Sequence, residues 1–421
     1  MGNILFPTTS LAFLHVVGML FSPFLQSLTL LLLGFLALSR LFFAPGQSWE
    51  NLGAYGRKVG FWVFGLLFLE VALGVFTAED PTYFLERLRL RLPFLGLPLA
   101  FFLLPPLPPK VYRNWWAAVL LLMDGVALGV ILNYLIHQEA IQMLLEMGKA
   151  IPTPANHIRY ALLQVIALCA AAYWGWHRVD LVSRPLRLFF RVSAVFLFLF
   201  LHFLAVRSGL FSLYFVLAAW VITYGLRQRA YGKLAALLVL MAFLPIIAVN
   251  VIPSLKHKLG YVRYDLEQLR QGAVNDQLSD SSRWISWKLG WELFREHPLT
   301  GVGAGNIRLE MDKLYTRDYP QFVKRLTPHN QFLMIMASSG LLGLGLFGLA
   351  FLIPILAEGN YRDTLLLSLH LAIFASFWME ATFETAMGVA VFLFFHLFHA
   401  RHCRPSGYLV GQGREIPSRI T

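Results

Sequence analysis

His329 is the residue of this sequence whose type and position best suit catalysis. It lies in the run Leu326-Thr327-Pro328-His329-Asn330, where a long polar segment ends and an apolar stretch begins. Thr327 suits an N-cap and Pro328 suits a first helical position, so we expect His329 in the first turn of a helix. Unpaired N–H groups and the positive end of the helix dipole disfavour an imidazolium there. A neutral imidazole accepts a proton, so His329 is a candidate general base; a hydrogen-bonded histidine without chemistry is the alternative.

Two arginines are placed to bind an anionic group. Arg207 occupies a connection of a few residues between two apolar runs, and Arg283 opens a tryptophan-rich run that ends at Phe294. A charge near hydrocarbon is costly and usually has a partner, and the planar guanidinium matches phosphate oxygens bidentately. Contact with lipid phosphate is the alternative for Arg207. Glu380 and Glu384 flank the last turn on the same predicted side, where they could pair with these arginines.

The composition requires a membrane around these residues. Of the 421 residues, 57% are hydrophobic and 14% are charged, whereas a soluble domain carries about 25% charge. Apolar runs of about 17–25 residues, the length that spans a bilayer, recur along the chain. The net charge of +12 is dispersed over short loops, which favours topology signals and lipid contact over nucleic acid. The chain is therefore predicted to be an all-α polytopic membrane protein.

The termini and the cysteines add little to this picture. The opening residues Met1–Ile4 lack a cationic region and a cleavage site, so we expect the first apolar run to be retained as a span. The two cysteines, Cys169 in a predicted span and Cys403 in the tail, imply neither a disulfide framework nor a metal cluster.

We predict about twelve spans and divide the chain accordingly. The spans are placed at residues 5–22, 24–43, 59–77, 92–106, 114–137, 158–176, 187–205, 208–226, 232–252, 329–356, 362–379 and 383–400. The resulting divisions are nine spans within 1–252, a large helical loop at 253–328, three spans within 329–400 and a tail at 401–421.

The distribution of lysine and arginine predicts the orientation. These residues are concentrated in every second loop and in the tail, so both termini are expected to be cytoplasmic. The segments expected on the outer side are 78–91, 138–157, 206–208, 253–328 and 380–382. Residues 83–91 and 138–149 mix apolar and basic side chains, which favours helices lying on lipid headgroups over a substrate groove.

The loop 253–328 is too long for a simple connection, and long ordered loops are usually functional. The run 284–294 has helical apolar spacing, and His297-Pro298 is expected to end that helix. Gly301–Asn306 is expected to pack its backbone closely beside the site, because neither a preceding strand nor a P-loop lysine supports phosphate binding. Asp265 and Glu267 have metal-like spacing, but a solvated face explains them by default.

Several polar and small residues lie within the predicted spans. Glu70, Asp124, His202 and His370 are scattered, which favours hydrogen bonds between helices over a transport pathway. The tenth span carries small residues that predict close helix packing, namely Ala337, Ser338, Gly340, Gly343, Gly345 and Gly348.

The histidine span resembles that of a known superfamily. His329-Asn330, nine residues, Gly340, two residues and Gly343 match the H-[NSQ]-x9-G-x-x-G pattern of bacterial O-antigen ligases. The stretch from Arg283 to Gly303 is similar to the corresponding loop, and so is the arrangement of many spans with one large loop before the histidine. The chain thus resembles the O-antigen ligase/polymerase superfamily, and the motif is less specific for ligases over polymerases.

The resemblance implies a GT-C type glycosyltransferase that needs no metal or other cofactor. It would move a glycan from undecaprenyl diphosphate onto lipid A–core, with inversion, at the periplasmic face of the bacterial inner membrane. The essential histidine of the family falls on His329, and its essential arginines fall on Arg207 and Arg283. The sequence Val206-Arg207-Ser208-Gly209 departs from the Ser-Arg-Gly order common in relatives, which weakens the match at Arg207.

Three further residues are expected to bind substrate, and two other functions are alternatives. Asn330, Arg263 and Arg325 are the remaining expected substrate-binding residues, with a solvated face as the alternative for the two arginines. A polymerase, whose acceptor is another lipid-linked glycan, and a transporter of lipid-linked glycan are the alternative functions.

Overall fold

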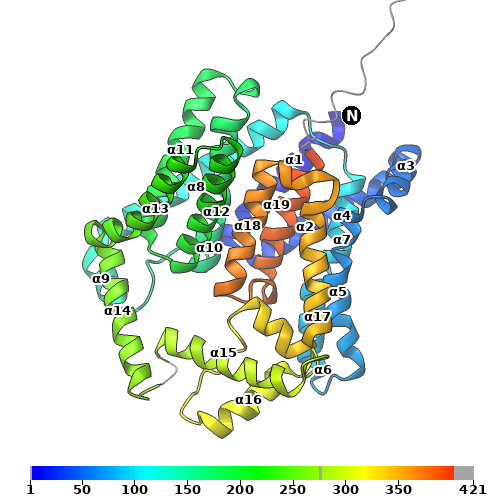
Figure 1. The fold of residues 1–421 in the computed structure, drawn as a ribbon. Helices are drawn as coiled ribbons and strands as arrows, with labels where there is room; N and C mark the ends of the chain where they lie inside the picture. The colour runs from blue at the N-terminus through cyan, green and yellow to red at the C-terminus, as the bar shows by residue number, and fades with distance from the viewer. Residues whose placement is uncertain (1, 275–276, 403–421) are drawn as a thin grey trace, which may run out of the picture.

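The computed structural model of the chain describes residues 2–274 and 277–402, and all regular elements in these residues are helices (Figure 1). Within the described residues, nine helical segments are long and apolar enough to cross a membrane. They are α1 (Gly2–Phe21), α2 (Pro23–Phe43), the segment Val59–Phe76 formed by α4 (Val59–Trp62), α5 (Gly65–Ala72) and η1 (Leu73–Phe76), α8 (Pro109–Ile136), α10 (His157–Ala172) with η2 (Tyr173–His177), α11 (Arg184–Leu204), α12 (Arg207–Arg227), α13 (Tyr231–Val251) and α17 (Gln331–Leu356). The protein is therefore a polytopic membrane protein. Cys403 and most of the predicted tail lie outside the described residues.

Three of the twelve predicted spans coincide with helices that are shorter than the nine. These are α7 (Pro93–Leu103), α18 (Thr364–Met379) and α19 (Ala386–His402). All three are rich in buried side chains, and α18 and α19 run through the middle of the bundle (Figure 1). Nine is thus the number supported by length and composition, and twelve stays a prediction.

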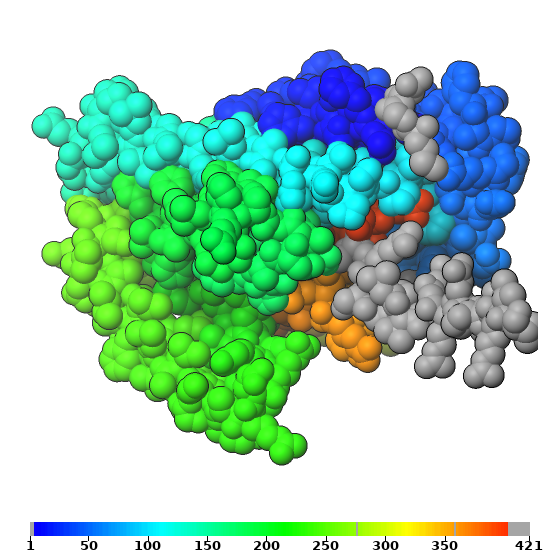
Figure 2. Space-filling view, turned by 90° about the horizontal axis from the view of Figure 1, so that it is seen from above, coloured from blue at the N-terminus to red at the C-terminus, as the bar shows by residue number. Residues whose placement is uncertain are grey.

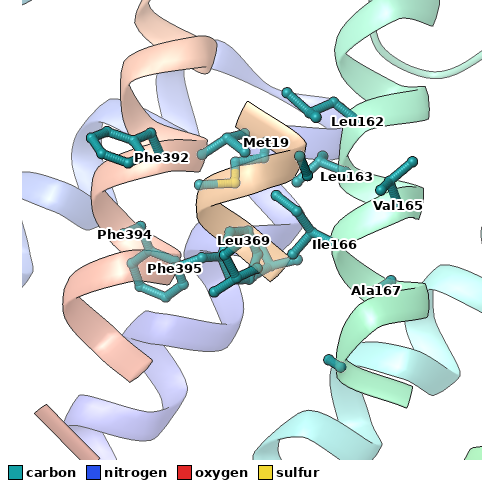
Figure 3. Close-up of a cluster of buried hydrophobic side chains, with 14 of the residues drawn as sticks. Met19, Leu162, Leu163, Val165, Ile166, Ala167, Leu369, Phe392, Phe394 and Phe395 are labelled. Atoms are coloured by element: carbon teal, nitrogen blue, oxygen red, sulfur yellow. The ribbon is translucent and has the colours of Figure 1, made fainter. Parts of the chain in front are cut away.

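The largest core cluster joins the central helices. Figure 3 shows Phe392, Phe394 and Phe395 of α19 in one buried cluster with Leu369 of α18 and Ile166 of α10. The α13 helix is the opposite case, because none of its residues is buried. Figure 2 shows the blue segment that includes α3 (Pro45–Gly56) at the right edge of the molecule. The core is therefore centred on α10, α18 and α19, with α13 outside it.

Polar residues within the spans join helices, as predicted. The bonds are Glu70 to Ser339, Asp124 to Ser193, His202 to Tyr214 and His370 to the carbonyl of Phe351. Each one links two different helices and gives a partner to a polar atom that hydrocarbon would leave unpaired, although Oε2 of Glu70 and Nδ1 of His370 have no partner among the described residues.

The large loop is helical and lies at one end of the bundle. It forms α14 (Pro253–Arg270), α15 (Ser279–Glu296) and α16 (Ile307–Asp318), and α15 ends before His297 as expected. Asp265 is fully buried and accepts hydrogen bonds from the N–H groups of Asp280 and Ser281. The solvated face expected for Asp265 is therefore wrong, because its carboxylate caps the free N-terminus of α15.

The tenth predicted span is interrupted by a loop from elsewhere in the sequence. Gly340 has φ 62° and ψ −159° inside α17, and the segment 298–303 enters the break. The N–H of Val302 donates to the carbonyl of Ala337, and the N–H of Leu341 donates to the carbonyl of Pro298, both at 2.9 Å. A Cβ on Gly340 would lie 2.3 Å from the carbonyl carbon of Leu299, so only glycine fits this approach.

This insertion explains part of the small-residue pattern. The close backbone packing expected at Gly301 is confirmed, because a Cβ there would lie 2.4 Å from the carbonyl carbon of Ser338. The close packing expected at Gly345 and Gly348 is wrong, since nothing lies within 4 Å of a Cβ at either position.

The five segments that the charge pattern places on one side of the membrane lie at the same end of the molecule (Figure 1). There α9 (Gln138–Glu146) packs against α14, and α6 (Pro81–Arg91) packs against η5 (Thr382–Glu384). The headgroup helix expected at residues 83–91 is wrong in one respect. Arg87 and Arg91 of α6 are buried and both bind Glu384, so this face of α6 points into the protein.

Candidate active site

His329 precedes α17 and does not open it. Asn330 is the N-cap, and its Oδ1 accepts hydrogen bonds from the N–H groups of Phe332 at 3.0 Å and Leu333 at 3.1 Å. The Asn330 Nδ2 donates to the carbonyl of Trp378 at 3.2 Å. The N-cap predicted at Thr327 is therefore wrong, because Asn330 already satisfies the first free N–H groups. The side chain of Asn330 is buried and bound to backbone, so its geometry supports positioning of His329 and gives no support to substrate binding.

The backbone of His329 is held by α15. Its N–H donates to the hydroxyl of Ser286 at 3.3 Å, and its carbonyl accepts from the indole of Trp287 at 3.0 Å. Pro328 packs against Gly290, where a Cβ would lie 2.6 Å from its ring. These contacts fix the histidine between the loop helix α15 and the spanning helix α17.

Glu380 connects His329 to Arg283. This carboxylate follows α18 and is 12% exposed, with His329 Nδ1 at 3.0 Å from Oε2 and Arg283 Nη2 at 2.7 Å from Oε1. Burial raises the pKa of the Glu380 carboxyl, but the hydrogen bond with His329 and the charges of Arg283 and Arg159 lower it further, to below its ordinary value. Glu380 is therefore a carboxylate at neutral pH and holds two expected site residues together.

The carboxylate determines which nitrogen of His329 can act as a base. A carboxylate only accepts, so in a neutral imidazole the proton would lie on Nδ1 and the lone pair on Nε2. The described residues provide no hydrogen-bond partner for Nε2, and the side chain is 30% exposed. Because His329 lies before α17, its expected place in the first helical turn is wrong, and its contact with the Glu380 carboxylate is the interaction that orients the ring.

Glu380 interacts with Arg283 and Arg159, and Lys258 interacts with Arg283 and Arg207. We call Arg159, Arg207, Lys258 and Arg283 the cationic cluster. Arg207 binds Asp280 bidentately at 2.6 and 2.7 Å, and Arg159 donates to the Thr385 hydroxyl at 3.1 Å.

Lys258 is coupled electrostatically to this cluster. Burial and the positive charges of Arg207 and Arg283, opposed by Asp280 and Asp265, lower the pKa of Lys258 to about 8. Its ammonium group donates to the carbonyl of Gly148. Four cations thus face two directly paired carboxylates, Asp280 and Glu380, and the excess suits an anion.

A cleft of about 650 Å³ opens on His329. We call it the His329 cleft; its lining consists of Tyr83, Glu86, Arg87, Leu90, Arg308, Asp312, Val323, Arg325, Leu326, Thr327, His329 and Glu384. Residues of α6 and of α16 both line this cleft, and the substrate groove that was the alternative for residues 83–91 stays a prediction.

The structure brings most of the predicted site residues together. Glu380 binds both His329 and Arg283, and Arg207 binds Asp280, which lies on α15 with Arg283. Arg325 lines the His329 cleft. Arg263 is exposed on α14 and does not line this cleft.

Sequence reasoning missed Lys258 and Arg159 and did not foresee that Glu380 binds His329. Arg159, like Arg207, is a charged residue at the predicted outer end of an apolar run, and this feature could have identified it. Lys258 carried no local signal that separated it from neighbouring basic residues.

Residues 192–348 match the family model for O-antigen ligase. The match includes Arg207, Arg283, His329 and the broken part of α17. A search of curated proteins finds no match. The match identifies an O-antigen ligase domain at residues 192–348 of this chain, and this domain indicates a glycan-transferring enzyme.

Proposed function

We propose that the protein is an O-antigen ligase, which moves a glycan from undecaprenyl diphosphate onto lipid A–core. The observation that carries the proposal is the shared carboxylate Glu380, which joins His329 to Arg283. It places a proton acceptor beside the cationic cluster, and these are the two groups that transfer from a lipid diphosphate requires.

In the proposed reaction, Nε2 of His329 takes the proton from an acceptor hydroxyl as its oxygen attacks the anomeric carbon. The bond from that carbon to the diphosphate oxygen breaks, and its electron pair leaves with the lipid diphosphate. Arg207 and Arg283 stabilise the charge that grows on this leaving group, which is the effect usually largest in catalysis. Direct displacement inverts the anomeric centre. This mechanism uses neither nucleotide nor metal, because the bond to diphosphate is already activated and side chains supply the positive charge.

The proposal includes the placement of the site. The cationic cluster and the His329 cleft lie at the end of the bundle that the charge pattern assigns to the outer side. We therefore assign the site to the periplasmic face of the inner membrane, with both termini cytoplasmic and a GT-C type architecture. The loop 253–328 would supply Lys258, Arg283 and the cleft wall, and would thus act as the catalytic segment.

The test is reconstitution of purified protein with a lipid-linked glycan and lipid A–core. A ligase joins the two substrates and releases undecaprenyl diphosphate, and this product would support the proposal. A polymerase lengthens the lipid-linked glycan in the absence of lipid A–core, and a transporter changes neither substrate. Either of the latter two results would contradict the ligase assignment.

A further inference from the structure

Every arginine that lines the His329 cleft is paired with a carboxylate that also lines it. Arg308 lies 3.5 Å from Glu86, and Arg325 lies 3.9 Å from Asp312. Deeper in the cleft, Arg87 lies 3.0 Å from Glu384. The three arginines and three carboxylates that line the cleft are equal in number, although Glu384 also binds the buried Arg91. The cationic cluster, by contrast, has more cations than directly paired carboxylates.

This balance selects against a phosphate group. A phosphate oxygen only accepts hydrogen bonds, and a phosphate entering here would approach Glu86 and Asp312, whose exposed fractions are 51% and 46%. Repulsion by these carboxylates opposes the attraction of the arginines. A donor diphosphate is therefore expected on the side of the cationic cluster.

The same balance suits sugar hydroxyls. Each hydroxyl both donates and accepts, so it can accept from a guanidinium and donate to the neighbouring carboxylate. Arg308 retains access to such a partner because it is 53% exposed, although its guanidinium also lies 4.1 Å from the ring centre of Tyr83. The cleft volume of about 650 Å³ lies within the range of about 300–1,000 Å³ typical of ligand sites.

We infer that the His329 cleft binds the acceptor, and that it selects an uncharged, hydroxyl-rich end of the acceptor glycan. The inference rests on the proposed function and adds the chemical class of the acceptor and its route to the base. His329 lines the cleft, so a hydroxyl bound between α6 and α16 reaches the base without crossing the cationic cluster.

The test measures acceptor and donor KM separately for Asp312→Asn and Glu86→Gln. Both substitutions keep side-chain shape and remove the negative charge, so the hydroxyl loses a charged acceptor. We expect the acceptor KM to rise about tenfold, in line with the loss of a hydrogen bond to a charged group. The donor KM should stay within twofold of wild type. Lys313→Ala is the matched control, because Lys313 follows Asp312 on α16 and pairs with Glu310 outside the cleft.

A second arm uses two purified lipid A–core acceptors, one ending in unphosphorylated hexoses and one with phosphate on the terminal hexose. The wild-type protein should prefer the first, and Glu86→Gln should reduce this preference because it leaves Arg308 uncompensated. Binding of the same two acceptors without donor gives a readout that does not depend on turnover. Thermal unfolding in detergent checks that each variant is folded.

The outcomes separate the inference from the proposed function. If the wild type transfers glycan and both variants keep its acceptor KM, or if it prefers the phosphorylated acceptor, the inference is overturned and the ligase proposal stands. If the wild type transfers nothing but still binds the unphosphorylated acceptor more tightly than Asp312→Asn does, the proposed function fails and the cleft assignment holds.

Discussion

The cationic cluster and the His329 cleft contain the same kinds of charged side chains in different proportions. In the cluster, two of the four cations are paired directly with a carboxylate, Arg207 with Asp280 and Arg283 with Glu380. In the cleft, all three lining arginines are paired with a lining carboxylate, and Glu384 also binds the buried Arg91. An excess of positive charge attracts an anion, and matched charges offer donors and acceptors to hydroxyls. Glu380 and His329 lie where the two regions meet. The difference indicates that the balance of charge, and not the presence of arginine alone, separates a diphosphate site from a sugar site.

The largest effect is expected where the two regions meet. His329→Ala removes the proposed base and should lower kcat by about 10²–10⁴-fold, with both KM values little changed. The control is His297→Ala, because His297 is exposed at the end of α15. Steady-state glycan transfer measures the effect. A residual rate within tenfold of wild type would exclude His329 as the base.

On the cationic side, Arg283→Ala should lower kcat by about 10²–10³-fold, because the leaving group loses a preorganised donor. Arg283→Lys should recover only part of this loss, since an ammonium lacks the bidentate guanidinium. Release of lipid diphosphate provides the measurement, and Arg295→Ala on the exposed part of the same helix is the control. Full activity of Arg283→Ala would remove Arg283 from the proposed mechanism.

Glu380 links the two regions, and its substitution should have a smaller effect on kcat. Glu380→Gln can still accept from His329 Nδ1 but loses its charge, so we expect kcat to fall about 10–100-fold, as for other groups that orient a functional histidine. Glu380→Asp should recover part of the rate if the charge is what matters. Single-turnover rates at saturating donor and acceptor measure this step. Equal rates for Glu380→Gln and wild type would show that the histidine needs no orienting carboxylate.

The smallest expected effect is that of pH on donor binding by the cationic cluster. Lys258 has a pKa of about 8, so it is charged at pH 7 and loses its proton as pH rises through 8. Because an anion binds the charged form, the donor KM should rise about fivefold between pH 7 and pH 9, equivalent to about 1 kcal/mol for one partly screened charge. Lys258→Arg should show no such rise, because arginine stays charged. A wild-type donor KM that is flat over this range would place Lys258 outside the binding site.

The sequence predicts the helices well because long apolar runs and a His-Pro stop are local signals. It could not predict the break in α17, because that break depends on the segment 298–303 inserting at Gly340. Thr327 and Asn330 are both good N-caps, and local preference alone does not choose between them. The choice depends on contacts of His329 and Pro328 with α15.

In the candidate site too, the sequence predicts residues with local signals but does not predict contacts between residues that are distant in the sequence. His329, Arg207 and Arg283 were found from residue type, position and the family motif. The pairing expected of Glu380 with these arginines is confirmed at Arg283, but Glu384 binds Arg87 and Arg91 instead. These partners are far apart in the sequence, and the burial of α6 against the turn after α18 is a property of the packed bundle.

The most direct test of the account compares Lys258→Met, in the cationic cluster, with Asp312→Asn, in the His329 cleft. Donor and acceptor KM values are measured for both variants in one reconstituted transfer assay at pH 7. We expect Lys258→Met to raise only the donor KM and Asp312→Asn to raise only the acceptor KM. If either variant raises the other KM, or if both variants raise the two KM values equally, the two regions do not divide the substrates as proposed.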